Sequence, residues 1–344
     1  MTVDHVLLAE PRGFCAGVEM AIKALTWMVR SFDEPVYCYH EIVHNKIVVE
    51  RFEAQGVIFV DSIDEVPEGA PIMLSAHGSA PEVTQQAEKI GGYTVDAVCP
   101  LVTKVHHEVK TRTKQGYQIV YVGHAGHEEA VGTIAVAPEA MHRVESPEEV
   151  FELPNLGEKV ALLAQTTLSH RDWEGVTDAA QERWSELWSP GRSDLCFATT
   201  NRQSALLALV DRCDSVIVIG STNSSNTRAL VKLAEQANGP DVIWVNRADE
   251  LPEGLSGTVG VTAGASAPEE TVEAVLKTLN PSKGVSIIQH TEEDEYFPPP
   301  RNLRELLSAI RFFVGFGFTG PNPTGHLNDR SIDAAKALQS LDTN

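Results

Sequence analysis

Three cysteines lie in similar local sequences, each just before a segment with helical periodicity. Cys15 stands in "AEPRGFCAGVEMAI", Cys99 in "TVDAVCPLVTKVHHEV" and Cys196 in "SDLCFATTNRQSALLALV". For any one cysteine, an inert buried thiol is the plainest interpretation. The thiolate is a metal ligand, however, and three thiols offered from equivalent loops indicate one shared metal centre.

The cysteine spacing does not choose the metal. Zinc usually takes four ligands, and local Cys-x-x-Cys pairs are absent from the sequence. The commonest local cysteine runs of iron–sulfur proteins are absent as well. Three thiolates with no evident fourth ligand leave an open position, which catalysis at a metal requires. Cys38 and Cys213 are expected to be inert thiols.

Hydroxyl and amide side chains gather at two further helix starts. The stretch "GSTNSSNT" contains Ser224, Ser225 and Asn226, and "AGASAP" contains Ser266. Simple N-capping needs only one such residue. The larger set predicts a phosphate or diphosphate cradle. The Gly-Lys-Ser/Thr ending of nucleotide phosphate loops is absent, which disfavours a nucleotide held in that way.

Four histidines, His44, His77, His124 and His127, stand at or near expected loops. A lone histidine is usually structural, but several at the ends of parallel strands can bind phosphate and keep a titratable proton. Glu128 and Glu129 follow directly. One of them is a candidate general acid, although two exposed carboxylates at a helix start would look the same.

Short apolar runs, polar loops and helix-period segments alternate along the chain. This pattern predicts an α/β fold with parallel sheets covered by helices. The cysteines divide it into three similar lobes at residues 1–98, 99–195 and 196–285, followed by a C-terminal segment at 286–344. A short helix is expected at 331–341, and Phe312, Phe313, Phe316 and Phe318 are expected to pack on the protein's own surface.

Helix starts are expected to carry capping boxes. The sequence Ser-Ala-Pro-Glu occurs at 79–82 and again at 266–269, and Thr200 and Gln203 have the same spacing. The repeat of the seven residues around each Ser-Ala-Pro-Glu also suggests repeated βα units.

Composition and charge restrict the class of protein. The chain has 344 residues and a formal net charge of −21, which argues against nucleic acid and anionic membranes as partners. The five cysteines, an odd number at low density in a chain expected to be cytosolic, argue against a disulfide framework. Because no leader or long apolar stretch is visible, we expect a cytoplasmic protein.

The motifs together resemble one known family. "PRGFCAGVEMAI", "EIVHNK", "SAHG", "CPLVTKVH", "GHAGH", "QTTLS", "CFATTNRQ", "GSTNSSNT" and "TAGASAP" occur in the order and spacing of the 4-hydroxy-3-methylbut-2-enyl diphosphate reductases, the LytB/IspH family. The resemblance covers roughly residues 5–300. It implies three α/β lobes in a pseudo-three-fold arrangement around a central iron–sulfur cavity.

The resemblance also implies a ligand set and site residues. A 4Fe–4S cluster is expected on Cys15, Cys99 and Cys196, with one iron open to substrate. Glu129 corresponds to the family's proton donor, and Thr166 to the residue that contacts the substrate hydroxyl. The diphosphate is expected to contact the following residues: His44, His77, His127, Ser224, Ser225, Asn226 and Ser266. Glu128 receives no role from the resemblance.

The implied activity is the last step of the methylerythritol phosphate route to isoprenoids. An allylic diphosphate is reduced by two electrons to isopentenyl or dimethylallyl diphosphate, with ferredoxin or flavodoxin as a low-potential donor. Two other classes stay open: a non-catalytic iron–sulfur sensor of isoprenoid diphosphates, and a zinc hydrolase. The sensor would not need Glu129 or Thr166, and the hydrolase would contain zinc and show no reductive turnover.

Overall fold

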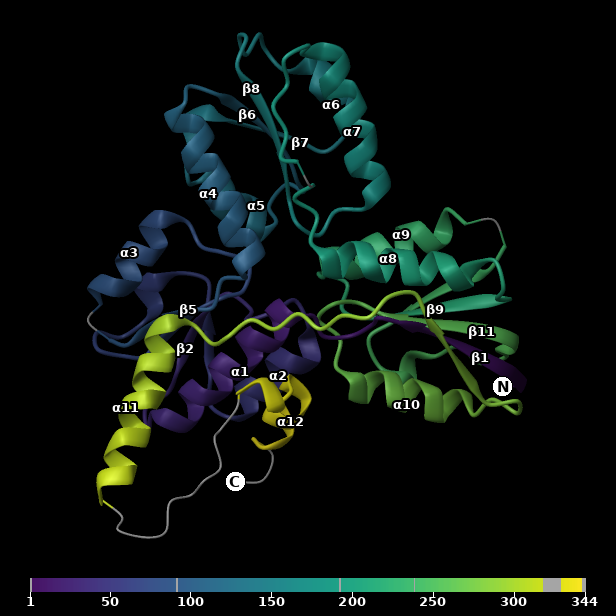
Figure 1. Ribbon diagram of the computed structural model, residues 1–344. Helices are drawn as coiled ribbons and strands as arrows, with labels where there is room; N and C mark the ends of the chain where they lie inside the picture. Colours follow the sequence, from purple (N-terminus) through teal and green to yellow (C-terminus); the bar gives the residue numbers. More distant parts are fainter. Residues whose placement is uncertain (1, 91, 192, 238, 318–328, 342–344) are drawn as a thin grey trace.

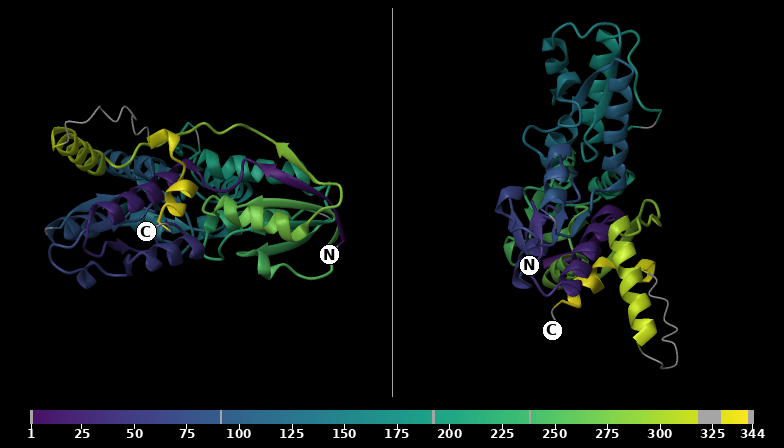
Figure 2. Two further views of the ribbon diagram at one scale, coloured as in Figure 1. Left: turned by 90° about the horizontal axis from the view of Figure 1, so that it is seen from below. Right: turned by 90° about the vertical axis from the view of Figure 1, so that its left-hand side faces the viewer.

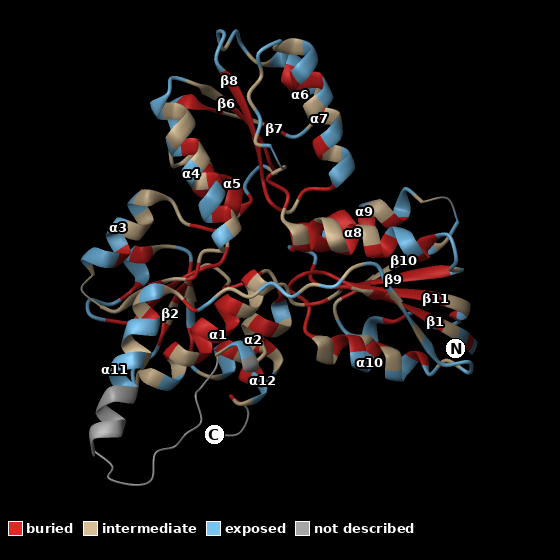
Figure 3. Cartoon of the chain, in the orientation of Figure 1, coloured by how far each residue is buried: buried red, intermediate tan, exposed pale blue. Residues whose placement is uncertain are grey.

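Three parallel sheets arranged around a common centre make up the protein (Figure 1). The computed structural model describes residues 2–341 except 91, 192, 238 and 318–328, and the side chains of 311–317 and 331 also lie outside the description. Figure 3 shows buried residues concentrated on the strands and on the inner helix faces. The predicted α/β fold with three lobes is confirmed.

The first lobe contains a four-stranded sheet in the order β3-β2-β4-β5. Its strands are β2 (Tyr37–Tyr39), β3 (Ile58–Val60), β4 (Ile72–Leu74) and β5 (Thr94–Asp96). Its helices are α1 (Ala16–Ser31), α2 (Lys46–Ala54) and α3 (Pro81–Lys89), with a 3-10 turn η1 (Ile63–Glu65). Helix α1 packs Ile22 and Leu25 into the core of this lobe, as the apolar periodicity predicted.

The second lobe contains a three-stranded sheet in the order β7-β6-β8. Its strands are β6 (Gln118–Val122), β7 (Met141–Val144) and β8 (Val160–Ala164). Its helices are α4 (Pro100–Lys114), α5 (Glu128–Ile134), α6 (Pro147–Glu152) and α7 (His170–Arg183), with η2 (Pro138–Ala140). Strand β8 is buried along its whole length, as expected for a strand covered on both faces.

The third lobe contains the largest sheet, in the order β10-β9-β11-β1-β12. Its strands are β1 (Thr2–Glu10), β9 (Ser215–Ile219), β10 (Asp241–Val245), β11 (Ser256–Ala263) and β12 (Val285–Gln289). Its helices are α8 (Phe197–Val210), α9 (Ser225–Glu235) and α10 (Glu269–Leu279), with η3 (Ala248–Glu250). Two of these strands come from outside the predicted range 196–285.

Strand β1 belongs to the third lobe, although it precedes the expected boundary at residue 98. Its residues pair in parallel with β11 on one side and with β12 on the other. The apolar run at 6–9 therefore completes a sheet whose other strands lie more than 200 residues further along the chain. Strand β12 reaches Gln289, so the third sheet ends four residues beyond the expected position 285. Sequence periodicity identifies a strand but not its partner.

The expected capping boxes are absent at all three helix starts. Helix α3 has Ala80 as its N-cap and α10 has Pro268, and neither N-cap makes a side-chain hydrogen bond. At α8 the N-cap is Cys196, and its sulfur accepts a hydrogen bond from the Thr199 amide. Pro81 is the first residue of α3, and Pro268 directly precedes α10 as its N-cap, which leaves the serine of each Ser-Ala-Pro-Glu sequence outside its helix.

The C-terminal segment crosses between lobes and returns to the first (Figure 2). It contains α11 (Arg301–Gly317), η4 (Asp329–Ser331) and α12 (Ala334–Gln339). Helix α12 confirms the short terminal helix and buries Leu338 in the core of the first lobe. The prediction for the four phenylalanines falls on side chains outside the description. Within the described ranges, no helix has the length and apolarity needed to cross a membrane.

Candidate active site

Three helices begin at the predicted cysteines. Cys15, Cys99 and Cys196 are the N-cap residues of α1, α4 and α8. All three line one central cavity, to which every lobe contributes. The positive ends of three helix dipoles therefore meet at this cavity, where they favour negative charge such as thiolate.

Burial opposes that charge. It raises the pKa of Cys196 to about 12, and the neighbouring Cys15 adds to the effect. The pKa of Cys99 is raised further, by burial and then by Cys15. Thiols in such surroundings stay protonated unless a cation compensates for the lost hydration. The donor set therefore fits metal ions better than a free catalytic thiolate.

The space among the sulfurs suits more than one metal ion. A tetrahedral zinc ion, at about 2.3 Å from each sulfur, would hold sulfurs about 3.8 Å apart. In the described part of the chain, the three cysteines do not form a set with every sulfur pair within 4.8 Å. Gly17 keeps the centre clear, because a Cβ there would lie 2.8 Å from Cys99 Sγ and 3.9 Å from Cys15 Sγ.

Glu129 and Thr166 form a buried pair at the edge of the same cavity. The Thr166 amide donates to Glu129 Oε1 at 2.7 Å, and the Thr166 hydroxyl donates to Oε2 at 3.0 Å. The carboxylate is 3% exposed, and burial raises its pKa to about 7 despite these hydrogen bonds. An acid with a pKa close to neutral is suited to proton transfer.

Histidines and hydroxyls from all three lobes line the other part of the cavity. His127 Nδ1 accepts a hydrogen bond from the Glu129 amide, so in the neutral ring the proton is on Nε2. His127 Nε2 and His44 Nε2 are buried and have no hydrogen-bond partner. Burial, then the charges of His77 and His44, lowers the pKa of His127 to about 2. Buried unpaired ring nitrogens of this kind predict a polar ligand.

The start of α9 contributes the polar side chains predicted there. Ser224 is the N-cap, and its hydroxyl accepts from the Thr227 amide at 3.3 Å. Asn226 Oδ1 accepts from the Ala265 amide at 2.9 Å, and Ser266 donates to the His44 carbonyl at 2.8 Å. The first and third lobes are thus joined at the cavity, where an anion would meet the N-terminus of α9.

Comparison with known proteins identifies the family. The family model described as LytB protein matches residues 6–280, which is most of the chain. The chain belongs to the LytB family. Its fold is similar to a solved structure of E-1-hydroxy-2-methyl-but-2-enyl-4-diphosphate reductase from Plasmodium falciparum. The TM-score is 0.86 and the identity 31%, over 90% of this chain and 99% of that one.

Curated members of the LytB family are similar over nearly their full length. The 4-hydroxy-3-methylbut-2-enyl diphosphate reductase of Streptomyces avermitilis is 45% identical over 93% of this chain and 96% of its own. The protein of the same name from Rhodopirellula baltica is 43% identical over 88% of this chain and 97% of its own. The resemblance inferred from the sequence motifs is therefore confirmed.

The LytB cavity is lined by every site residue that the family resemblance implied. His124 lies apart: it does not line the cavity, and its ring is 3.3 Å from the Glu145 carboxylate. Cys38 is fully buried, whereas Cys213 is partly exposed and donates to the Leu209 carbonyl.

Three features of the LytB site were not predicted. Phe197 and Phe297 line the cavity, with ring centroids 6.5 Å apart. Arg202 is fully buried and donates to the carbonyls of Gly13 and Phe14, and it also pairs with Glu293. The sequence signal for Arg202 was its position six residues after Cys196, on the cysteine's own helix.

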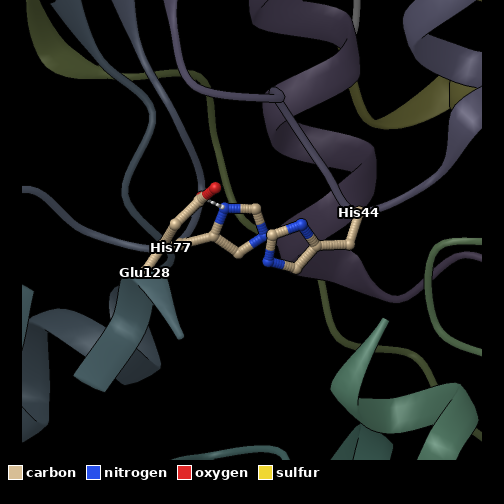
Figure 4. A group of neighbouring side chains, drawn as sticks. All are labelled: His44, His77 and Glu128. Carbon is tan, nitrogen blue, oxygen red and sulfur yellow. Dashed lines mark ion pairs between the residues drawn. The ribbon is translucent and has the colours of Figure 1, made fainter. Parts of the chain in front are cut away.

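The third feature is Glu128, whose carboxylate lies among histidines (Figure 4). Its Oε2 is 2.8 Å from His77 Nδ1. Glu128 with His44 and His77 is also the one set, within the described residues, whose possible metal-ligating atoms all lie within 4.8 Å of one another. The sequence shows two adjacent glutamates, and nothing in it indicates which of them faces Thr166 and which faces His77.

Proposed function

We propose that this chain reduces (E)-4-hydroxy-3-methylbut-2-enyl diphosphate to isopentenyl and dimethylallyl diphosphate, the terminal step of the non-mevalonate pathway. The observation that supports this most directly is the shared cavity. An acid with a pKa near 7, three thiols and a set of unpaired histidines line it together. The reaction consumes two electrons and two protons, breaks one C–O bond and releases water.

Cys15, Cys99 and Cys196 would hold the cofactor. Their separation, the room left by Gly17 and three helix N-termini fit a 4Fe–4S cluster better than one zinc ion. When bound, the cluster supplies single-electron transfer and one open iron as a Lewis acid. We propose that the lobes at residues 1–98, 99–195 and 196–285 each contribute one thiolate, with β1 and β12 completing the third.

The diphosphate would occupy the polar part of the cavity. His127 presents a proton on Nε2 in its neutral form, and His44 and His77 provide further ring nitrogens. The start of α9 adds backbone amides and the side chains of its N-cap Ser224 and of Ser225 and Asn226. Ser266, which precedes α10, completes the set. This arrangement binds an anion without any lysine or arginine among the cavity-lining residues.

Glu129 would deliver the proton that lets the hydroxyl leave as water. Its pKa near 7 gives a substantial protonated fraction at neutral pH. Thr166 fixes the carboxyl through two hydrogen bonds, and Thr166 itself lines the cavity. Thr166 would in this way orient both the acid and the substrate hydroxyl. A donor of the ferredoxin or flavodoxin type would supply the electrons.

One experiment tests the proposal in two parts. Mössbauer spectra of iron-57-labelled protein, purified without oxygen, should show a 4Fe–4S signal with one distinct iron that changes when the allylic diphosphate is added. Stoichiometric zinc without iron would support the hydrolase alternative. An iron–sulfur signal indifferent to substrate, with no turnover, would support the sensor.

Glu129→Gln tests the proton donor. We expect turnover to fall about 100-fold or more, with iron content and substrate affinity retained. Glu139→Gln is the matched control, because Glu139 is exposed on the same lobe. Unchanged turnover in Glu129→Gln with an intact cluster would overturn the assignment of Glu129.

A further inference from the structure

Adjacent glutamates at the start of α5 face different surroundings. Glu129 turns toward Thr166, as described above, and makes both of its side-chain hydrogen bonds there. Glu128 turns toward His77 of the first lobe (Figure 4). Oε2 lies 2.8 Å from His77 Nδ1, and Oε1 lies 3.8 Å from His40 Nδ1. One helix turn thus carries two carboxylates with separate partners.

The contact between Glu128 and His77 is partly buried and keeps some exposure to solvent. The side chains of His77 and Glu128 are 14% and 23% exposed. The close pair is not aligned as a hydrogen bond, since His77 Nδ1 and Glu128 Oε2 both lack a hydrogen-bond partner. The two atoms nevertheless lie at hydrogen-bond distance, so a small rotation of the carboxylate would align them as a hydrogen bond.

A second carboxylate repeats the arrangement beside it. His44 Nδ1 lies 3.4 Å from Glu41 Oε2, and the rings of His44 and His77 stack with centroids 3.8 Å apart and planes 16° apart. Each of the two stacked rings thus has a carboxylate at Nδ1. Two protonated rings this close would repel each other strongly, and a carboxylate on each offsets the repulsion.

The stacked rings also argue against a metal ion bound by His44, His77 and Glu128, although the spacing of these residues would allow one. Lone pairs of imidazole nitrogens lie in the ring plane. In two nearly parallel stacked rings these lone pairs point side by side and do not converge on one ion. The arrangement therefore fits a carboxylate-paired histidine stack better than a bound cation, although the ligand atoms are within 4.8 Å of one another.

The electrostatics keep Glu128 available for this pairing. Although burial opposes it, contact with His77 and the charges of His77, His44 and His40 lower the pKa of Glu128 to about 2. Glu128 is therefore a carboxylate at neutral pH. Because the Glu128 carboxylate lies against Nδ1 of His77, Nε2 is the ring nitrogen available to a ligand in the cavity that His77 lines.

We propose that Glu128 is a positioning residue for diphosphate binding: its carboxylate accepts a hydrogen bond from His77 Nδ1–H and so holds the ring, and the imidazolium form of that ring donates a second hydrogen bond, from Nε2–H, to a phosphate oxygen. The inference rests on the proposed function, in which His77 contacts the diphosphate. A carboxylate behind a ligand-binding histidine fixes the ring and its proton positions, as it does in metal sites where the same pairing orients the imidazole.

The test compares Glu128→Gln and Glu128→Ala with the wild-type holoenzyme, purified without oxygen. We expect KM for the allylic diphosphate to rise about fivefold in both variants, with kcat within twofold of wild type. The dissociation constant of inorganic diphosphate, measured by calorimetry, should rise by the same factor. If Glu128 had a purely structural role, its loss would lower kcat and the iron content. A positioning role predicts a higher KM with kcat and iron content retained.

Glu139→Gln serves as the matched loss of one negative charge on the same lobe, and KM should stay unchanged. An unaltered or lower KM in Glu128→Gln would overturn the inference, because Glu128 would then be neutral or repulsive toward the diphosphate. Tight binding of one added Zn²⁺, lost in Glu128→Gln while KM stays the same, would overturn it in favour of a metal site. If the wild-type protein itself fails to reduce the substrate, the proposed function fails instead.

Discussion

Glu129 accepts two hydrogen bonds from Thr166, one from its amide and one from its hydroxyl, across the boundary between β8 and α5. Both bonds lower the pKa of Glu129, yet burial raises it to about 7. The carboxyl is therefore held in place by groups that favour its ionised form, within surroundings that favour the neutral form. This balance allows the group to lose and regain a proton near neutral pH.

Activity should depend on pH through the protonation of Glu129. Proton donation requires the neutral carboxyl, so kcat/KM should fall about tenfold per pH unit above a pKa near 7. The measurement is kcat/KM between pH 6 and 9 with a chemical reductant of constant potential. A profile that stays flat to pH 9 would contradict the role of Glu129 as the acid.

The same carboxyl makes stability depend on pH. Its pKa is about 7 in the folded chain and 4.5 ordinarily, so the folded state binds the proton more tightly. Stability due to this group is therefore present below pH 4.5 and is lost as pH rises through 7, by up to about 3 kcal/mol. Glu129→Gln lacks this loss. Its unfolding free energy relative to wild type should rise between pH 5 and 8, as measured by denaturant titration.

Thr166→Val should separate the effects of the two hydrogen bonds that Thr166 donates to Glu129. Valine keeps the amide donor and loses the hydroxyl, which lowers the pKa of Glu129 in the wild type. We expect the alkaline limit of kcat/KM to move to higher pH, while the maximum falls about tenfold or more. Thr278→Val on the exposed face of α10 is the control. An alkaline limit that moves to lower pH would refute this account.

Gly17→Ala tests the space at the cysteines. The added Cβ would lie 2.8 Å from Cys99 Sγ, closer than real Cβ contacts allow. We expect iron bound per chain, measured after anaerobic reconstitution, to fall by more than half. Gly191→Ala, where a Cβ meets nothing within 4 Å, should bind iron like the wild type. Full iron content in Gly17→Ala would show that the sulfurs do not need this clearance.

Arg202→Gln should weaken the loop that carries Cys15. Arg202 donates to the carbonyls of Gly13, Phe14 and Ala198 and pairs with Glu293, which is 15% exposed. Its loss leaves those carbonyls and a mostly buried carboxylate without their partner, at a cost of about 3 kcal/mol. Denaturant unfolding measures the cost, with Arg212→Gln at the protein surface as the control. A loss under 0.5 kcal/mol would contradict this role.

The sequence by itself determined the chemistry-bearing residues and the elements that present them. Cys15, Cys99 and Cys196 directly precede helices because each is followed by a helix-forming segment with apolar periodicity, which is a local property. The same holds for Ser224 at the start of α9. Local patterns of this kind survive in any fold that keeps the helices.

Only the tertiary structure decided which elements meet. Strand β1 pairs with β11 on one edge and with β12 on the other. Both partners lie more than 200 residues further along the chain, so no local signal encodes the pairing. Glu128 and Glu129 are adjacent in sequence, yet successive helix residues point in directions about 100° apart. Which one meets His77 and which meets Thr166 depends on how α5 sits between two lobes, and that is set by packing across the whole cavity.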